Sequence, residues 1–456
     1  MRFWTLEAFQ AAFVSIASMA LLVLFAAWLS TRIRALGDTP RALVAGAFGL
    51  VLGPPLLDWL PVTRLGLETL VYHGLGLVFA AVALRKPAPK EKTSHDARII
   101  AASLPGLASV QGLVGVGVVA AMLALGSDVH IGFGLLLPLG FNQGPGQALS
   151  MGEAWEPLGL EDGGAIGLII ASLGFAWCAI GGLYFTGLTP RQNSGQREEA
   201  AELSTAARVL MAGGSGWSRV VWATLALAVV YALTYACLWF AGGLMARPES
   251  VALLYGFHFM IALSLGVGVR PVLARFERPA DDSALALMSG SMVDVTTTAA
   301  LSAISLAVFT RWLGPVLVLT GIGGIVTFMV CRWLQPKFQH HGLEHALLIF
   351  GIATGTFLTG MALLRAIDPD YSSTAGRNAV VAAGAEVVFA APLLLLVLPY
   401  AVSSYAESPW SSLGTTAGLL AVHAALMVLA GVRLTRAWRV DPASRASQTR
   451  PVPTIS

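Results

Sequence analysis

Apolar runs long enough to cross a bilayer recur along the whole chain and constrain its fold more than any other feature. A spanning helix needs about 20 mostly apolar residues. Only 12% of the residues are charged, whereas a soluble domain carries about 25%. These features predict an all-α polytopic membrane protein and exclude a soluble globular protein and a coiled coil. The predicted crossings are 8–30, 42–60, 66–84, 99–125, 163–188, 219–244, 251–269, 284–309, 313–331, 378–402 and 411–432.

Two further apolar stretches, near 131–152 and 344–364, are rich in glycine and do not resemble plain spans. With the N-terminus outside, 24 of the 28 Lys and Arg residues fall on the cytoplasmic side, as the positive-inside rule requires. This bias holds only if neither glycine-rich stretch crosses the membrane. We therefore expect both to be re-entrant, with the C-terminus cytoplasmic. The first run lacks a small-residue cleavage site and is expected to be a retained helix.

Five predicted crossings precede a long polar segment and five follow it, and each half places its re-entrant stretch between its fourth and fifth helices. Because five is odd, the second half is inverted relative to the first, an arrangement that secondary transporters use. The alternative is an inert scaffold of packed helices. The predicted organisation is two inverted five-helix repeats, 1–188 and 218–402, a cytoplasmic linker at 189–217, one extra C-terminal transmembrane helix at 411–432 and a cytoplasmic tail at 433–456.

The first re-entrant stretch contains three glycines and a proline within the seven residues 140–146. These residues prevent a regular helix, and broken backbone inside a membrane is tolerated only where it is buried in protein or lines a cavity. Exposed carbonyls hold cations, and a helix N-terminus holds a carboxylate. The alternative is a kinked packing turn. The candidate substrate-binding residues here are Asn142, Gln143, Gly144, Gly146 and Gln147.

The second stretch, 351–360, combines glycines with three threonines. Hydroxyl oxygens suit a hard monovalent cation, although threonine and glycine also serve close helix packing. Arg365 follows this stretch and is either a clamp for a substrate carboxylate or a snorkelling anchor. The candidate substrate-binding residues here are Thr354, Gly355, Thr356, Thr359 and Arg365.

Few ionisable groups lie within the predicted spans, and each is costly to bury in a membrane. Asp294 is flanked by apolar and hydroxyl residues, and Glu386 lies in the tenth crossing. Gln111 is a polar residue at mid-span that serves either a site or an interhelical hydrogen bond. The tentative sodium ligands are Gln111, Asp294, Thr354 and Thr356.

A haem or metal centre is a rival interpretation, because His73, His258 and His423 lie in spans. Each is alone on its helix, and no Cys-x-x-Cys pair accompanies them. No hydrolase, Walker or zinc-protease motif occurs, so neither an enzyme nor an ATP-driven pump is expected. The formal net charge of +3 is too small to predict nucleic-acid binding. The energy source would be an ion gradient, with Na⁺ as coupling ion and no other cofactor.

Several short motifs follow one another along the chain. They are Thr39-Pro40 with Val44-Ala45-Gly46, Gly74 to Leu77, Val110-Gln111-Gly112, Gly144 to Ala148, Ala171 to Phe175 and Gly351 to Arg365. The order of these motifs resembles the bacterial sodium/glutamate symporter family. The resemblance implies sodium-coupled uptake of glutamate, or a related small organic anion, by a homodimer in the bacterial inner membrane. Pro145 and Gln147 stand where the family has histidine and threonine, and the eleventh helix is additional.

The alternative transporter is a cation/proton antiporter that uses Asp294 or Glu386.

Overall fold

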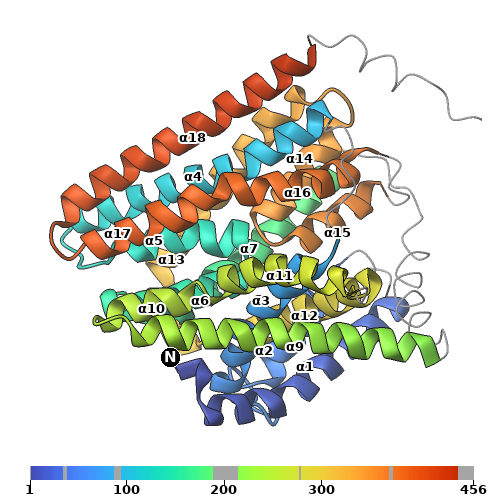
Figure 1. Ribbon diagram of the computed structural model, residues 1–456. Helices are drawn as coiled ribbons and strands as arrows, with labels where there is room; N and C mark the ends of the chain where they lie inside the picture. Colours follow the sequence, from blue (N-terminus) through green and yellow to red (C-terminus); the bar gives the residue numbers. More distant parts are fainter. Residues whose placement is uncertain are drawn as a thin grey trace, which may run out of the picture.

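The protein is built from long, roughly aligned α-helices (Figure 1). The computed structural model describes residues 2–33, 39–86, 94–187, 214–276, 279–368 and 373–439, and these ranges contain no β-strand. Nine of the helices described there are long and apolar enough to cross a membrane. The predicted class, an all-α polytopic membrane protein, is therefore confirmed.

The nine candidate spans follow the predicted crossings closely, apart from their ends. Most of the predicted linker 189–217 and of the tail 433–456 lies outside the described residues, but 214–217 begin α9 and 433–439 extend α18. The spans are α1 (Leu6–Arg32), α3 (Arg64–Leu84), α4 (His95–Ala124), α7 (Gly163–Thr186), α9 (Gly214–Gly243), α12 (Asp282–Ser302), α13 (Leu306–Leu334), α16 (Ala375–Pro392) with η6 (Leu393–Val397) and α17 (Leu398–Ser404), and α18 (Pro409–Arg439).

Two predicted crossings differ from a plain spanning helix. The run 42–60 forms only the 12-residue helix α2 (Arg41–Leu52), about 18 Å long and too short to span. Gly53, Pro54 and Pro55 follow it, and these residues cannot continue a helix. The run 251–269 is divided at Phe257 into α10 (Pro248–Gly256) and α11 (His258–Arg275), which are bent by 56°.

Residues 131–155 form a helical hairpin, hereafter hairpin 1. It consists of α5 (Ile131–Pro138), a short π-helical segment η3 (Leu139–Gln143) and α6 (Pro145–Trp155). The two ends of the hairpin lie together, because a Cβ built on Gly132 would be 3.0 Å from the Trp155 ring. The chain therefore enters and leaves this hairpin at the same end of the molecule.

Residues 342–367 form a second hairpin, hereafter hairpin 2, from α14 (Gly342–Ala353) and α15 (Phe357–Ile367). Its two helices approach closely at a pair of glycines, since a Cβ on Gly351 would lie 2.7 Å from the Gly360 Cα. Only a residue without a side chain allows this approach. The two glycines thus set the spacing of the hairpin.

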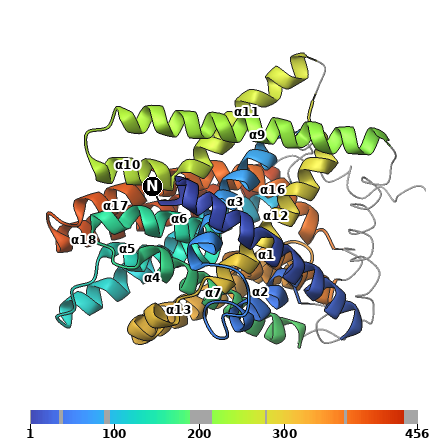
Figure 2. The same ribbon diagram turned by 90° about the horizontal axis from the view of Figure 1, so that it is seen from below.

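The two hairpins open toward opposite faces of the molecule. We call the face that carries Arg2 the Arg2 face. Hairpin 1 begins directly after the C-terminal end of α4, and Glu153 near its end pairs with Arg2. Hairpin 2 opens beside the N-terminal end of α4, where Asn378 accepts a hydrogen bond from Ser94 and donates one to His345. Figure 2 shows α9 and α11 on one flank of this bundle and α13 on the other.

Candidate functional site

The tips of the two hairpins meet inside the bundle. Gly144 turns the chain between η3 and α6 with φ of +88°, a conformation that favours glycine. A Cβ built on it would lie 3.3 Å from Thr356 Cγ2 and 3.5 Å from the Gly355 carbonyl oxygen. The two glycine-rich stretches singled out in the sequence are therefore in contact, although they are more than 200 residues apart.

Helix α7 lies against both hairpins along a stripe of glycines. A Cβ on Gly174 would be 2.7 Å from the Thr354 carbonyl oxygen and 3.0 Å from the Phe141 ring. Gly167 and Gly181, seven residues before and after, face the backbone of Ala148 and the ring of Phe350. Because seven residues are about two helical turns, the three glycines share one face. They allow α7 to contact hairpin 1, the junction and hairpin 2 in turn.

The hairpin tips overlap in depth along α4. The Asn142 side chain on hairpin 1 donates to the Leu104 carbonyl oxygen at 2.9 Å. The Gln111 amide on α4 donates to the Ala353 carbonyl oxygen on hairpin 2 at 2.9 Å. Leu104 and Gln111 are seven residues apart, which corresponds to about 10 Å of helical rise. Each tip therefore reaches past the other rather than stopping short of it.

Two buried amide oxygens in this region have no hydrogen-bond partner among the described residues, namely Gln111 Oε1 and Asn142 Oδ1. Their orientation is determined by chemistry, because each amide nitrogen faces a carbonyl oxygen that can only accept. The Gln111 nitrogen also donates to Thr327 Oγ1 at 2.9 Å. An unsatisfied buried acceptor costs about 1–3 kcal/mol. Both oxygens are therefore available to a cation or to a donor group of a ligand.

The second helix of each hairpin begins at the tip, so two helix N-termini lie near the junction. In hairpin 2, Thr356 and Thr359 cap α15 reciprocally. In hairpin 1, α6 begins at Gly144 and Pro145 without a side-chain cap. The first N–H groups of a helix have no intrahelical partner and carry a partial positive charge. The uncapped start of α6 is thus the better place for an anion.

The remaining polar side chains at the tips are already engaged. The Thr354 hydroxyl donates to the Phe350 carbonyl oxygen at 2.8 Å, and the Thr359 hydroxyl lies 2.9 Å from the Gly351 carbonyl oxygen. Gln147 donates to Gln143 at 3.3 Å. Hydroxyl oxygens that donate in this way still have lone pairs for a cation.

Three polar residues from the sequence analysis lie away from the tips. Arg365 is nine residues beyond Thr356 on α15, which places it about 13 Å from the tip toward the base of hairpin 2. Asp294 accepts from Arg41 Nε at 2.8 Å and is thereby tied to α2. Glu386 lies within α16 and makes no hydrogen bond or ion pair with the described residues. The geometry therefore favours an anchoring position for Arg365 over a clamp at the junction.

Sequence reasoning missed the contribution of Thr327 and of the carbonyl groups of Leu104 and Ala353. Nothing in the sequence distinguishes these residues from other helix residues. The glycine stripe of α7 was visible as a seven-residue spacing, and that signal could have identified α7 as the helix shared by both hairpins.

The histidines within the helices take part in ordinary hydrogen bonds. The ring nitrogens of His73, His258 and His423 all contact protein groups. Across the part of the chain that the structure describes, no group of three or more His, Cys, Asp or Glu side chains could hold a metal ion.

The chain was also compared with known proteins. No family model, no curated protein and no solved structure matches it. The expected resemblance to sodium/glutamate symporters therefore rests on the order of the sequence motifs alone.

Proposed function

We propose that the protein is a secondary transporter that couples sodium to the uptake of glutamate, or of a related small organic anion, across a bacterial inner membrane. The observation that carries this proposal is the contact between two hairpins that open toward opposite faces. Broken elements that meet in this way place a binding site between two aqueous faces. We take both hairpins to be re-entrant.

We further infer that the two halves are inverted repeats. Helix α2 packs on α12 as α11 packs on α3, and α16 packs on α4 as α13 packs on α7. In a two-fold exchange of the halves, α2 corresponds to α11, α3 to α12, α4 to α13 and α7 to α16. The exchange then turns each of these contacts into the other contact of its pair. The α3–α12 contact is unchanged by the exchange and lies at the centre. Together with the opposed hairpins, this pattern supports alternating access around a central site.

The C-terminal end of α14 offers oxygen ligands for the sodium ion. The Ala353 carbonyl and the Gln111 side-chain amide lie there. Two hydroxyl groups are close by: Thr354 follows Ala353 in the chain, and Thr327 on α13 accepts a hydrogen bond from the Gln111 amide. A helix C-terminus carries a partial negative charge that attracts a cation. Asp294 is paired with Arg41, so we place the ion with Gln111 and Thr354 rather than with Asp294.

The uncapped start of α6 offers the complementary site for the carboxylate of the substrate. Gly146 and Gln147 lie in its first turn, where N–H groups point out of the helix. A carboxylate at this helix N-terminus and a cation at the end of α14 would neutralise each other across the hairpin contact. This pairing provides a physical basis for coupling the ion to the substrate.

Uptake of radiolabelled glutamate into proteoliposomes tests the proposal. We expect uptake that requires an inward sodium gradient and that potassium does not support. If glutamate is not transported, a panel of small dicarboxylates and amino acids under the same gradient defines the substrate. Failure of every anion would contradict the proposal.

A cation/proton antiporter is the second candidate, and Glu386 favours it. This carboxylate lies 11 residues into α16, about 16 Å from its start, and has no partner among the described side chains. Ionisable groups at such depth are functional-site candidates by default. A pH-driven cation flux without anion uptake, lost in Glu386→Gln, would establish this alternative.

A further inference from the structure

The segment Arg2–Trp4, which precedes α1 and forms the short helix η1, packs into the Arg2 face of the molecule. We call this segment the strap. Phe3 is buried, with only 3% of its surface exposed. The strap contacts helices from both halves of the chain, and it also reaches hairpin 1.

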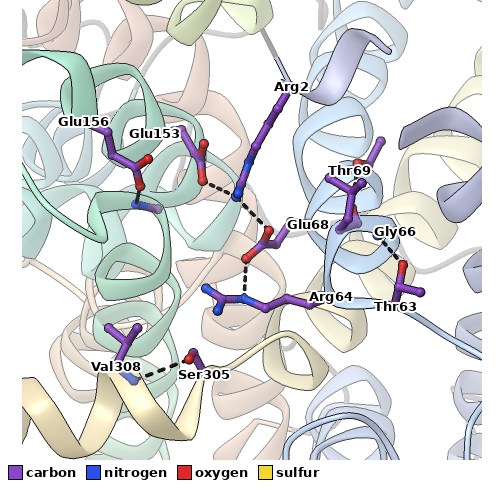
Figure 3. A network of polar contacts seen from close by, with 12 residues as sticks. Arg2, Thr63, Arg64, Gly66, Glu68, Thr69, Glu153, Glu156, Ser305 and Val308 are labelled. Carbon is purple, nitrogen blue, oxygen red and sulfur yellow. Dashed lines mark hydrogen bonds and ion pairs between the residues drawn. The ribbon is translucent and has the colours of Figure 1, made fainter. Parts of the chain in front are cut away.

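Arg2 joins hairpin 1 to α3 through a single nitrogen. Its Nη2 lies 2.7 Å from Glu68 on α3 and also contacts Glu153 on α6 (Figure 3). Glu68 has a second arginine, since Arg64 Nε approaches it at 2.8 Å. The Glu153 side chain is 14% exposed, and Arg2 is its ion-pair partner. A carboxylate with so little access to water depends on that partner.

The other two residues of the strap attach it to helices outside the hairpins. The His73 ring donates from Nε2 to the Phe3 carbonyl oxygen at 2.8 Å. The Trp4 indole donates to the Tyr72 hydroxyl at 3.2 Å, and its ring stacks on Tyr235 of α9 with centroids 4.9 Å apart. The strap is therefore anchored on α3 and α9, and the Arg2 side chain extends from it to hairpin 1.

We propose that the strap is a releasable clasp that holds the outer end of hairpin 1 against α3. The Arg2–Glu153 contact is the part that opens, because Phe3 and Trp4 remain bound to α3 and α9 when α6 moves. Separation of α6 from α10 would expose Ala154, which now faces Gly256. That the opening accompanies transport rests on the proposed function, whereas the clasp itself does not.

Thiol labelling measures the clasp without any transport assay. In purified protein with Cys178, Cys237 and Cys331 replaced by alanine, Ala154→Cys is a buried reporter. We expect Arg2→Gln to speed its reaction with a maleimide about three- to fivefold, the scale of a partly exposed charge pair. Arg2→Lys should stay near the parent rate, because one ammonium can still contact both carboxylates.

Arg64→Gln is the matched control, since it removes a guanidinium from Glu68 without touching Glu153. It should leave the labelling rate of Ala154→Cys within about twofold. A second reporter, Leu306→Cys, is already exposed and should label equally in every variant if the fold is intact. An unchanged rate in Arg2→Gln, or an equal rise in Arg64→Gln, would overturn the clasp.

Cross-linking then connects the clasp to transport. A reducible bis-methanethiosulfonate joining Arg2→Cys to Glu153→Cys should stop uptake, and dithiothreitol should restore it. The same reagent joining Arg2→Cys to Glu68→Cys leaves hairpin 1 free and should not inhibit. If the labelling results hold but no substrate is transported by any variant, the clasp stands and the proposed function fails. Full uptake through the Arg2–Glu153 cross-link would show that hairpin 1 does not need to be released.

Discussion

The two hairpins have similar outlines but differ in how firmly the rest of the molecule holds them. In hairpin 1, every residue of α5 is buried, and so are ten of the eleven residues of α6. In hairpin 2, nine of the twelve residues of α14 are buried, but only Thr359, Gly360 and Leu364 are buried in α15. The second helix of hairpin 2 is thus the less tightly packed element at the junction.

This difference has a physical origin in the surrounding core. Hairpin 1 contributes Phe133, Phe141 and Trp155 to the largest apolar cluster, and Arg2 fastens its outer end. Helix α15 packs mainly on α14 through the Gly351–Gly360 contact. Elements with few buried contacts open at lower free-energy cost. We therefore expect hairpin 2 to be the gate that opens more readily and hairpin 1 to require release of a specific contact.

The largest expected effect is on folding, from a side chain added inside hairpin 1. In Gly134→Leu, the new Cβ would lie 2.3 Å from the Gly115 carbonyl oxygen on α4, and relief of this overlap needs a backbone shift. We expect a loss of about 3 kcal/mol or more, seen as low monodisperse yield and a lower Tm. Gly384→Leu on α16 has open space around it and is the matched control. A normal Tm for Gly134→Leu would contradict the tight packing of hairpin 1.

The next effect is on sodium dependence and concerns the tip of hairpin 2. Gln111→Leu removes the donor to the Ala353 carbonyl and the orphan oxygen together. We expect the sodium concentration for half-maximal uptake to rise about tenfold, because an unpaired buried carbonyl and a lost ligand cost about 1–3 kcal/mol. Gln111→Glu keeps an oxygen ligand but also loses the donor to the Ala353 carbonyl, so it should raise this sodium concentration less than Gln111→Leu does. Wild-type sodium dependence in Gln111→Leu would remove this residue from the ion site.

A third measurement compares the hairpins directly by hydrogen exchange in detergent. Amides of α15 should exchange at least about tenfold faster than those of α6, since only three of its residues are buried and opening is easier where packing is sparse. Arg2→Gln should raise the amide exchange rates of α6, and so reduce the difference in exchange rate between α15 and α6. Equal protection of both helices in the wild type would refute the asymmetry.

The smallest effect is expected at the base of hairpin 2. Arg365→Gln should change the KM for substrate by less than about threefold, because Arg365 lies nine residues beyond Thr356, about 13 Å from the tip. Gly146→Val, at the start of α6, should raise KM far more. A Cβ on residue 146 would lie 3.0 Å from the Leu75 side chain. The Tm of Gly146→Val is therefore measured as well, to separate a change in substrate binding from a loss of stability. A large KM change in Arg365→Gln would restore the clamp interpretation.

Much of the fold follows from local sequence signals. The lengths of the apolar runs predicted most of the candidate spans, because a crossing needs about 20 mostly apolar residues. The glycines and the proline at 140–146 and the glycines at 351–360 determined where the helices break. The early end of α2 was also indicated in the sequence by Gly53, Pro54 and Pro55. The apolar run 42–60 that contains these residues led to the prediction of a longer helix.

Only the tertiary structure decided which of these local features face one another. Gln111 and Ala353 are 242 residues apart, and Asp294 is paired with Arg41 across 253 residues. Contacts at such separation depend on how helices stack, and no periodicity or turn signal encodes them. The same reason explains why the sequence left Arg365 open to both a clamp and an anchoring role, and why it gave Arg2 no role beyond its charge. Composition and spacing are local properties, whereas the partner of a buried polar group is a property of the packed whole.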